Sequence, residues 1–237
     1  MTVWWLAWRS ALARRRLFAW NVAVPALLLT PVAMSETAAP HRVAVYGVFL
    51  VFFSTFGAAI PTVRDARDGW LDTVFRTGVS RRAWLVQTAL AETALDIVEL
   101  APVVAVIALT GRGSPAASLA LLTGALPLAL LFANVAGVVL AALVRSLAEA
   151  ALAGAAVSLF LLHFAGFFRP AAPGWTRTVA AFDPYSLLRV ALEQVEGGSS
   201  PATAHPWWPA VMALSLATLA ALTAGRWTRR FEWPADR

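Results

Sequence analysis

Three acidic side chains lie within one strongly apolar stretch of the sequence, residues 84–110. Glu92, Asp96 and Glu99 stand at positions i, i+4 and i+7, which at 100° per residue places them in one narrow stripe of a helix. An ionisable group at the centre of a bilayer costs about 2.5–3.5 kcal/mol on insertion scales, so such groups usually face a cavity or a partner. The stripe therefore indicates either a path for a cationic substrate or a set of ion pairs between subunits.

A structural interpretation accounts for two of these three residues. Glu92 and Asp96 would lie near the cytoplasmic headgroups, where arginines can pair with them. The candidate partners are Arg81, Arg82 and Arg145. Glu99 would then be the one deep carboxylate, and its role is left open.

Other chemistries find little support in the sequence. There is no GxxxxGK[ST] loop, so this chain is not expected to hydrolyse ATP by the P-loop mechanism. The residues His41, His163 and His205 are scattered without metal-ligand spacing, and there is no Cys. We therefore expect no catalytic residue, no metal and no cofactor. The basic residues form no single basic face, so nucleic acid is not an expected partner.

The acidic stripe belongs to a chain whose composition is that of a membrane protein. Hydrophobic residues make up 59% and charged residues 14% of the 237, more apolar surface than a soluble domain of this size buries. Because a spanning helix needs about 20 mostly apolar residues, we expect an all-α integral membrane protein with six transmembrane helices in a single domain, residues 1–237. The predicted spans are 17–34, 43–63, 84–110, 119–143, 150–168 and 207–225. Small residues such as Ala133 and Gly137 predict close helix approach.

The arginines predict the orientation of the chain. All 19 basic residues are Arg, and 14 of them lie at the N-terminus, at the C-terminus, in the segment 64–83 or in the turn 144–149. Positive charge accumulates on the cytoplasmic side of a membrane. Both termini are therefore expected to be cytoplasmic in a multi-pass protein of the cell membrane.

Two short helices outside the spans are predicted from apolar spacing. Residues 3–16 favour a helix along the membrane surface, since Trp residues there can enter the interface while Arg residues meet headgroups; the alternative is the frayed start of the first span.

In the external segment, Asp183 and Pro184 offer an N-cap and a first helical residue. The apolar positions that follow, beginning with Tyr185, indicate an amphipathic helix over 183–196, with Arg189 off its stripe. The pattern does not decide whether this helix is re-entrant or lies on the surface.

The cytoplasmic segment 64–82 contains a further charged, short helix. Leu71, Val74 and Phe75 form a small apolar face on it, ahead of a turn at Gly78. Exposed apolar residues rimmed by charge are typical of a docking surface. The alternative is a solvated loop with incidental apolar residues.

Taken together in their order along the chain, these features resemble the permease subunit of ABC type-2 exporters. The resemblance rests on the basic N-terminal helix, a first span with Pro25 and Pro31, the run Asp68-Gly69-Trp70-Leu71-Asp72 before Ser80-Arg81, and the external run Phe182-Asp183-Pro184-Tyr185 leading to Arg189. The family usually has Pro where Gly78 stands here.

The resemblance implies a six-helix permease that dimerises, as a homo- or heterodimer, and pairs with a separate ATPase carrying a P-loop. The segment 64–78 would be the coupling helix and 3–16 the connecting helix. The residues that this assigns to ATPase coupling are Asp68, Gly69, Leu71, Asp72, Phe75 and Arg76.

The substrate is expected to be hydrophobic or amphipathic, and the stripe of Glu92, Asp96 and Glu99 favours a cationic one. The long external segment favours the drug and multidrug export type over the similar haem-exporter branch. The competing hypothesis is a non-transporting membrane scaffold or assembly protein that recruits a cytoplasmic partner through 64–82.

Overall fold

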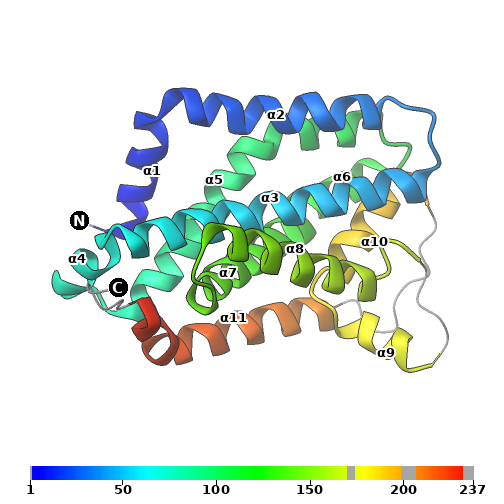
Figure 1. Cartoon of the computed structure of the whole chain (residues 1–237). Helices are drawn as coiled ribbons and strands as arrows, with labels where there is room; N and C mark the ends of the chain where they lie inside the picture. The colour runs from blue at the N-terminus through cyan, green and yellow to red at the C-terminus, as the bar shows by residue number, and fades with distance from the viewer. Residues whose placement is uncertain (1, 170–173, 199–206, 232–237) are drawn as a thin grey trace.

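The computed structural model describes residues 2–169, 174–198 and 207–231, and every regular element among them is a helix (Figure 1). Backbone polar groups within lipid must be satisfied inside their own segment, which is why long apolar runs become helices. Within these described ranges, six helices are long and apolar enough to cross a membrane. They are α2 (Arg15–Ala33), α3 (Ala39–Arg67), α5 (Arg81–Thr110), the continuous α6–η1–α7 (Pro115–Leu143), α8 (Leu147–Phe164) and α11 (Trp208–Trp227). The predicted all-α fold with six spans is confirmed.

The helix bounds differ from the predicted ones by a few residues. The second span is longer at both ends than the predicted 43–63, because Pro40 opens the helix and Arg64–Arg67 continue it. The fifth span ends at Phe164 rather than at 168. Gly166, two residues after this end, adopts a positive φ of 86°. The fourth begins as α6 (Pro115–Ala120), passes through a π-helical turn, η1 (Leu121–Ala125), and continues as α7 (Leu126–Leu143).

Short helices gather at the two ends of the bundle (Figure 1). One end, called here the α4 end, carries α1 (Val3–Ala13), α4 (Trp70–Arg76) and η2 (Thr228–Phe231). The other, the α10 end, carries α9 (Trp175–Phe182) and α10 (Ser186–Val195). The basic residues that begin α2 and α5 and end α3 and α11 all lie at the α4 end. They are Arg15, Arg16, Arg64, Arg67, Arg81, Arg82 and Arg226.

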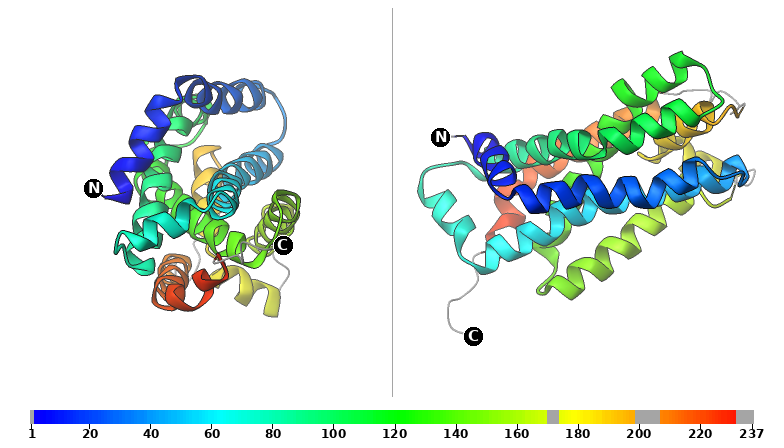
Figure 2. Two further views of the ribbon diagram at one scale, coloured as in Figure 1. Left: turned by 60° about the vertical axis from the view of Figure 1, so that its left-hand side comes forward. Right: turned by 90° about the horizontal axis from the view of Figure 1, so that it is seen from above.

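The core is built around α3, which packs against α7 and α8. One apolar cluster fills the α10 half of the bundle and includes Tyr46, Leu130 and Leu192; a second, around Trp84, fills the α4 end. The helices α2 and α11 lie on opposite sides of the bundle (Figures 1 and 2), and few of their residues are buried. Their outer faces are the ones available to lipid or to another subunit.

Close approach between α3 and α7 depends on Gly137. A Cβ atom at this position would lie 2.4 Å from the backbone oxygen of Thr55 and 3.0 Å from Ala58 Cβ. No side chain fits there, so the backbones of the two helices meet directly. The close approach predicted from Ala133 and Gly137 is confirmed.

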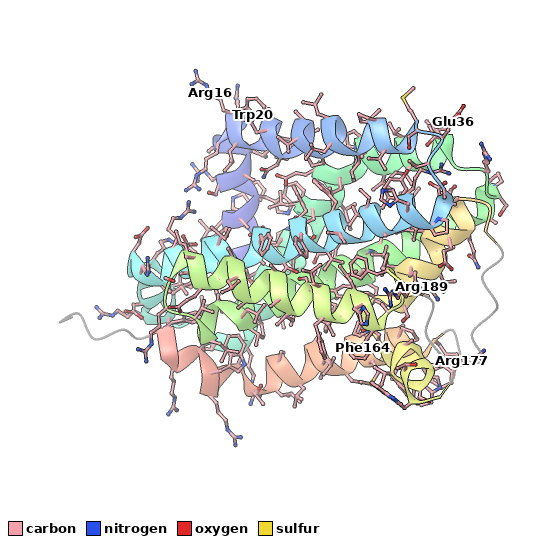
Figure 3. All side chains as sticks on the ribbon, turned by 45° about the vertical axis from the view of Figure 1, so that its right-hand side comes forward. Arg16, Trp20, Glu36, Phe164, Arg177 and Arg189 are labelled. Carbon is pink, nitrogen blue, oxygen red and sulfur yellow. The ribbon has the colours of Figure 1, made fainter. Side chains whose placement is uncertain are left out.

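The N-terminal helix is separate from the first span, but it is shorter than predicted. It ends at Ala13, Arg14 forms the junction, and Arg15 and Arg16 already belong to α2. Val3 at its start is buried, and its backbone N–H donates to Gln87 Oε1 on α5 at 2.9 Å. A frayed start of α2 would not turn away in this manner, so the bounds 3–16 are corrected to 3–13. Figure 3 shows Arg16 projecting away from the bundle.

Candidate functional site

A large cavity lies between α1, α2, α3 and α5. It has a volume of about 1640 Å³, and it exists because α2 packs on α5 and makes few contacts with α3. The cavity runs from Trp70 at the α4 end to His41 and Phe168 towards the α10 end. Four aromatic rings of α3 line its wall: Phe49, Phe52, Phe53 and Phe56.

The acidic residues of α5 line the same cavity. Glu92, Asp96 and Glu99 all contribute to its wall, and Asp96 and Glu99 are buried. Since apolar residues make up most of the lining, the carboxylates are the main polar groups in the middle of this space.

Two of the carboxylates are oriented by amides from neighbouring helices. Asn134 of α7 is fully buried and donates from Nδ2 to Asp96 Oδ2 at 2.8 Å. Asn21 of α2 donates from Nδ2 to Glu99 Oε1 at 3.1 Å. Glu92, by contrast, has no hydrogen-bond or ion-pair partner among the residues that the structure describes. It is therefore the carboxylate available to a molecule in the cavity.

The interpretation that Glu92 and Asp96 pair with arginines is wrong. Within the described chain, no salt bridge joins either of them to the arginines proposed as partners. Arg81 instead donates to Thr228 Oγ1 at 3.2 Å and lies over the ring of Phe75. Asp96 is therefore buried on α5 and does not pair with an arginine at the membrane surface.

The second candidate site is the connection between α3 and α5. Asp68 ends α3, and Gly69 has a left-handed φ of 70°, which turns the chain into α4. Gly78 has a φ of 87° and leads towards α5. The predicted helix over 64–78 is therefore wrong in its bounds, because α4 covers only Trp70–Arg76 and the preceding residues extend α3.

The apolar face of α4 points into the protein. Leu71 is 1% exposed and Val74 is buried. Phe75 packs edge-on against Trp84 of α5, with ring centroids 5.6 Å apart. The prediction that these three residues form an exposed apolar face is wrong, since the bundle itself covers them. They fix α4 to the ends of α3 and α5.

The opposite side of α4 is exposed. Trp70 is 40% exposed, and Thr73 and Arg76 are also on the surface. Positions 70, 73 and 76 share one side of a helix. Asp68 is exposed beside them, whereas Asp72 is half-buried. We call Trp70, Thr73 and Arg76 the α4 outer face; sequence reasoning did not select Trp70 or Thr73.

The described residues 174–198, before the last span, form two helices where one was predicted. The additional helix, α9, has no buried residue. The predicted helix, α10, begins at Ser186 rather than at Asp183, although Asp183 Oδ1 accepts a hydrogen bond from the Tyr185 N–H at 2.8 Å. Its apolar side packs into the bundle against α3, α6 and η1. The helix is therefore inserted between spans and does not lie on the surface.

Other predicted residues of this segment have separate partners. Pro184 and Tyr185 are buried, and the Tyr185 ring packs edge-on against Phe132. Arg189 pairs with Glu193 one turn later, and Figure 3 shows it on α10 close to the bundle. None of these residues lines the cavity that contains the acidic stripe.

Burial raises the pKa of Asp183 to about 7, and the Tyr185 N–H moderates the shift. The folded pKa exceeds the unfolded value of about 3.9, so the folded protein binds more protons between these values and loses stability as pH rises through them. Replacing Asp183 with Asn keeps an acceptor oxygen and removes the titration. Between about pH 5 and pH 8, the melting temperature of wild type should fall by roughly 5–10 °C relative to that of Asp183→Asn. Thermal unfolding in detergent measures this difference.

The exposed residue Glu36 provides the control for this substitution. Glu36→Gln makes a comparable change from carboxylate to amide at an exposed position, where substitutions usually change stability by less than about 0.5 kcal/mol, so it should melt as wild type does. A melting difference between wild type and Asp183→Asn that does not change with pH would contradict the prediction.

A buried ion pair at the α10 end was not predicted. Arg42, in the first turn of α3, donates from Nε to Glu196 Oε2 at 3.0 Å, and a second guanidinium nitrogen contacts the same oxygen. The side chains are 9% and 2% exposed. Arg42 also donates to the backbone oxygens of Ser35 and Thr37 at 3.2 and 2.6 Å. The pair joins residues 154 positions apart, and no local pattern indicates it.

Among the described residues, six apolar helices, a cavity bounded by three of them and a short surface helix between the second and third spans define a polytopic helical membrane protein. Within this class of membrane proteins, the chain belongs to the ABC-2 type transporter family, whose model matches residues 1–196. The match includes the first five spans, α4 and α10. No curated protein and no solved structure that was compared with the chain matches it. The chain is therefore a membrane permease of an ABC transporter, and the membrane domains of this family are not themselves catalytic.

Proposed function

We propose that this chain is the permease subunit of an ATP-driven exporter that moves a hydrophobic or amphipathic substrate outward, with energy from a separate ATPase subunit carrying a P-loop. The observation that carries the proposal is the α4 outer face, a charged and aromatic surface between the second and third spans. Membership of the ABC-2 family supports it. The drug-export type remains our proposal over the haem-export type.

The α4 end is the cytoplasmic end in this proposal. The arginines that begin and end the spans at this end give it the positive charge typical of the cytoplasmic side. The helices α1 and η2, which hold the two ends of the described chain, lie at the same end (Figure 1). Both termini would then be cytoplasmic in a protein of the cell membrane, with α1 as the connecting helix at its inner surface.

The way α4 is fixed suits it to transmit movement. The buried Leu71 and the contact between Phe75 and Trp84 join α4 to the ends of α3 and α5. An ATPase bound to the outer face would therefore displace two spans together with α4. Asp68, Gly69, Asp72 and Arg76 would shape or contact the interface, while Leu71 and Phe75 would act from inside the permease and not in a groove of the ATPase.

A second permease copy, identical or homologous, would complete the transporter. The helices α2 and α11 present long apolar faces that the single chain leaves exposed, including Leu27, Leu28 and Leu219. Such faces fit either lipid or another copy. The two permeases would move relative to each other when the ATPases close on ATP.

Copurification from the native membrane tests the ATPase partnership. A P-loop protein with ATPase activity should copurify with the wild-type chain. Its recovery should fall about tenfold or more with Trp70→Ala/Arg76→Glu, because exposed Trp and Arg residues are frequent interface hot spots.

Trp20 and Arg16 offer a matched control on α2, where both project away from the bundle (Figure 3). The variant Trp20→Ala/Arg16→Glu carries the same two changes and should retain the ATPase. Leu71→Asp is a poor substitute for the test variant, since a charge at a buried position would unfold the α4 end. If wild type brings down no ATPase, the transport proposal fails, and a membrane scaffold becomes the better account.

A further inference from the structure

The cavity between α2, α3 and α5 has two chemically different walls. The α5 wall carries the carboxylates Glu92, Asp96 and Glu99, whereas the α3 wall carries phenyl rings, including Phe49 and Phe52. Carboxylates attract a cation by charge, and the faces of aromatic rings stabilise a cation within about 6 Å. The two walls therefore favour the same kind of ligand.

The polar stripe on α5 extends one turn beyond the acidic residues. Thr88 lines the cavity four positions before Glu92, and its Oγ1 is buried without a hydrogen-bond partner. From Thr88 to Glu99 the stripe is about 16 Å long at 1.5 Å per residue. Thr88 Oγ1 is inaccessible, so Glu92, which lines the cavity and lacks a partner within the described residues, is the group of this half of the stripe that can meet a ligand.

The basic residues of the lining lie at the ends of the cavity. Arg14 and Arg64 are at the α4 end, together with Asp65 and Asp68, and His41 is towards the α10 end. Among the residues that the structure describes, the lining between these ends contains acidic residues and no Arg. Carboxylates in a membrane interior are costly unless a cation or a hydrogen-bond donor accompanies them. Asn134 and Asn21 serve Asp96 and Glu99 in this way, and Glu92 has no such donor.

We propose that the cavity is a binding site for a lipophilic monocation. The ligand's charge would lie beside Glu92, and its apolar groups would contact the phenyl rings of α3. Asp96 and Glu99, held by their amide donors, would add negative potential without leaving their positions. A volume of about 1640 Å³ exceeds the roughly 300–1,000 Å³ of common small-molecule pockets, so a bulky ligand fits. That this ligand is exported rests on the function proposed above.

Binding is tested on the full chain in lipid nanodiscs, without an ATPase. Tetraphenylphosphonium is the cationic probe, and tetraphenylborate is its anionic counterpart of nearly the same shape. After the partition of each probe into empty nanodiscs is subtracted, because the dipole potential of a bilayer favours the anion, the cation should bind at least tenfold more tightly than the anion. Glu92→Gln should weaken cation binding about tenfold, which corresponds to one carboxylate contact of about 1.4 kcal/mol. Glu36→Gln makes the same change at an exposed site and should bind as wild type does.

Two outcomes of the binding measurement would overturn the proposal. One is equal protein-dependent affinity for the cation and the anion, which would show that the cavity does not select a ligand by its charge. The other is unchanged cation binding by folded Glu92→Gln.

A labelling experiment tests the location and does not depend on the Glu92 variant. Since the chain has no Cys, Gly57→Cys gives a single thiol in the cavity, and its Cβ would lie 3.9 Å from Asp96 Oδ1. Tetraphenylphosphonium should slow maleimide labelling of this thiol at least fivefold. It should not affect labelling of Leu152→Cys, on the exposed side of α8.

Two labelling results would count against the cavity. Lack of protection at position 57 would place the cation elsewhere. No labelling at all would mean that a second copy of the chain fills the space. Failure of these tests with ATPase copurification intact would remove the binding site alone, whereas loss of the ATPase with probe binding intact would remove the transport proposal alone.

Discussion

Replacing Gly137 with Ala is expected to lower the free energy of unfolding by about 2 kcal/mol, although only one methyl group is added. The new Cβ would lie 2.4 Å from the Thr55 backbone oxygen and 3.2 Å from the Ala59 backbone nitrogen. Backbone atoms cannot rotate away as a side chain does, so α3 and α7 would have to move apart. These two helices form the most extensive contact in the bundle. Denaturant titration in detergent, followed by Trp fluorescence, measures the change.

Gly225→Ala on α11 is the matched control. No atom lies within 4 Å of the position that its Cβ would occupy. Because Ala is about 1 kcal/mol better than Gly inside a helix, this variant should be as stable as wild type or more so. Equal stability of Gly137→Ala and Gly225→Ala would contradict the backbone contact between α3 and α7.

The spans were predictable because lipid imposes a simple condition on the sequence. A segment that crosses a bilayer needs length and apolar character, and both are local properties. Even α5, with its three acidic residues, was recognised as a span. The helix ends were less predictable, since Arg64–Arg67 and Arg81–Arg82 extend α3 and α5 beyond the apolar run.

The direction in which α4 faces was not predictable from its own residues. Apolar residues at 71, 74 and 75 indicate that one side is covered, but they do not say by what. The covering residues include Trp84, whose ring packs against Phe75. Phe231, which is contributed by η2 at the far end of the described chain, packs in turn against the ring of Trp84. The apolar face of α4 therefore predicted a contact with an ATPase, whereas the structure shows a contact with the bundle. The residues to mutate in a test of ATPase binding accordingly change from Leu71 and Phe75 to Trp70 and Arg76.

The acidic stripe was predictable as a helical pattern, but its partners were not. Helical geometry places Glu92, Asp96 and Glu99 together on one side of α5. Asn21 and Asn134 come from α2 and α7, and each is a single polar residue in an apolar run. A single amide in an apolar run, aligned with an acidic residue on another span, is a sequence signal. From it, Asn21 and Asn134 could have been predicted as the partners in place of the arginines.

Glu196→Ala is expected to destabilise the protein by about 3–5 kcal/mol, the range seen when one partner of a buried ion pair is removed. The Arg42 guanidinium would lose the carboxylate that faces it and would remain buried with only the carbonyl groups of Ser35 and Thr37. Unfolding of the purified chain measures the loss. Glu193→Ala, three residues earlier on α10, provides the control. Its pair with Arg189 is partly exposed, so its removal should cost about 1 kcal/mol or less.

The double variant Arg42→Leu/Glu196→Leu separates the penalty of an unpaired charge from the value of the pair. Apolar replacement of both partners of a buried ion pair is often neutral, but here it leaves the carbonyl groups of Ser35 and Thr37 without their donor. The double variant should therefore be more stable than Glu196→Ala and less stable than wild type. A double variant no more stable than Glu196→Ala would mean that Arg42 acts mainly on the α2–α3 loop. Wild-type stability of Glu196→Ala would show that the pair contributes nothing to the α10 end.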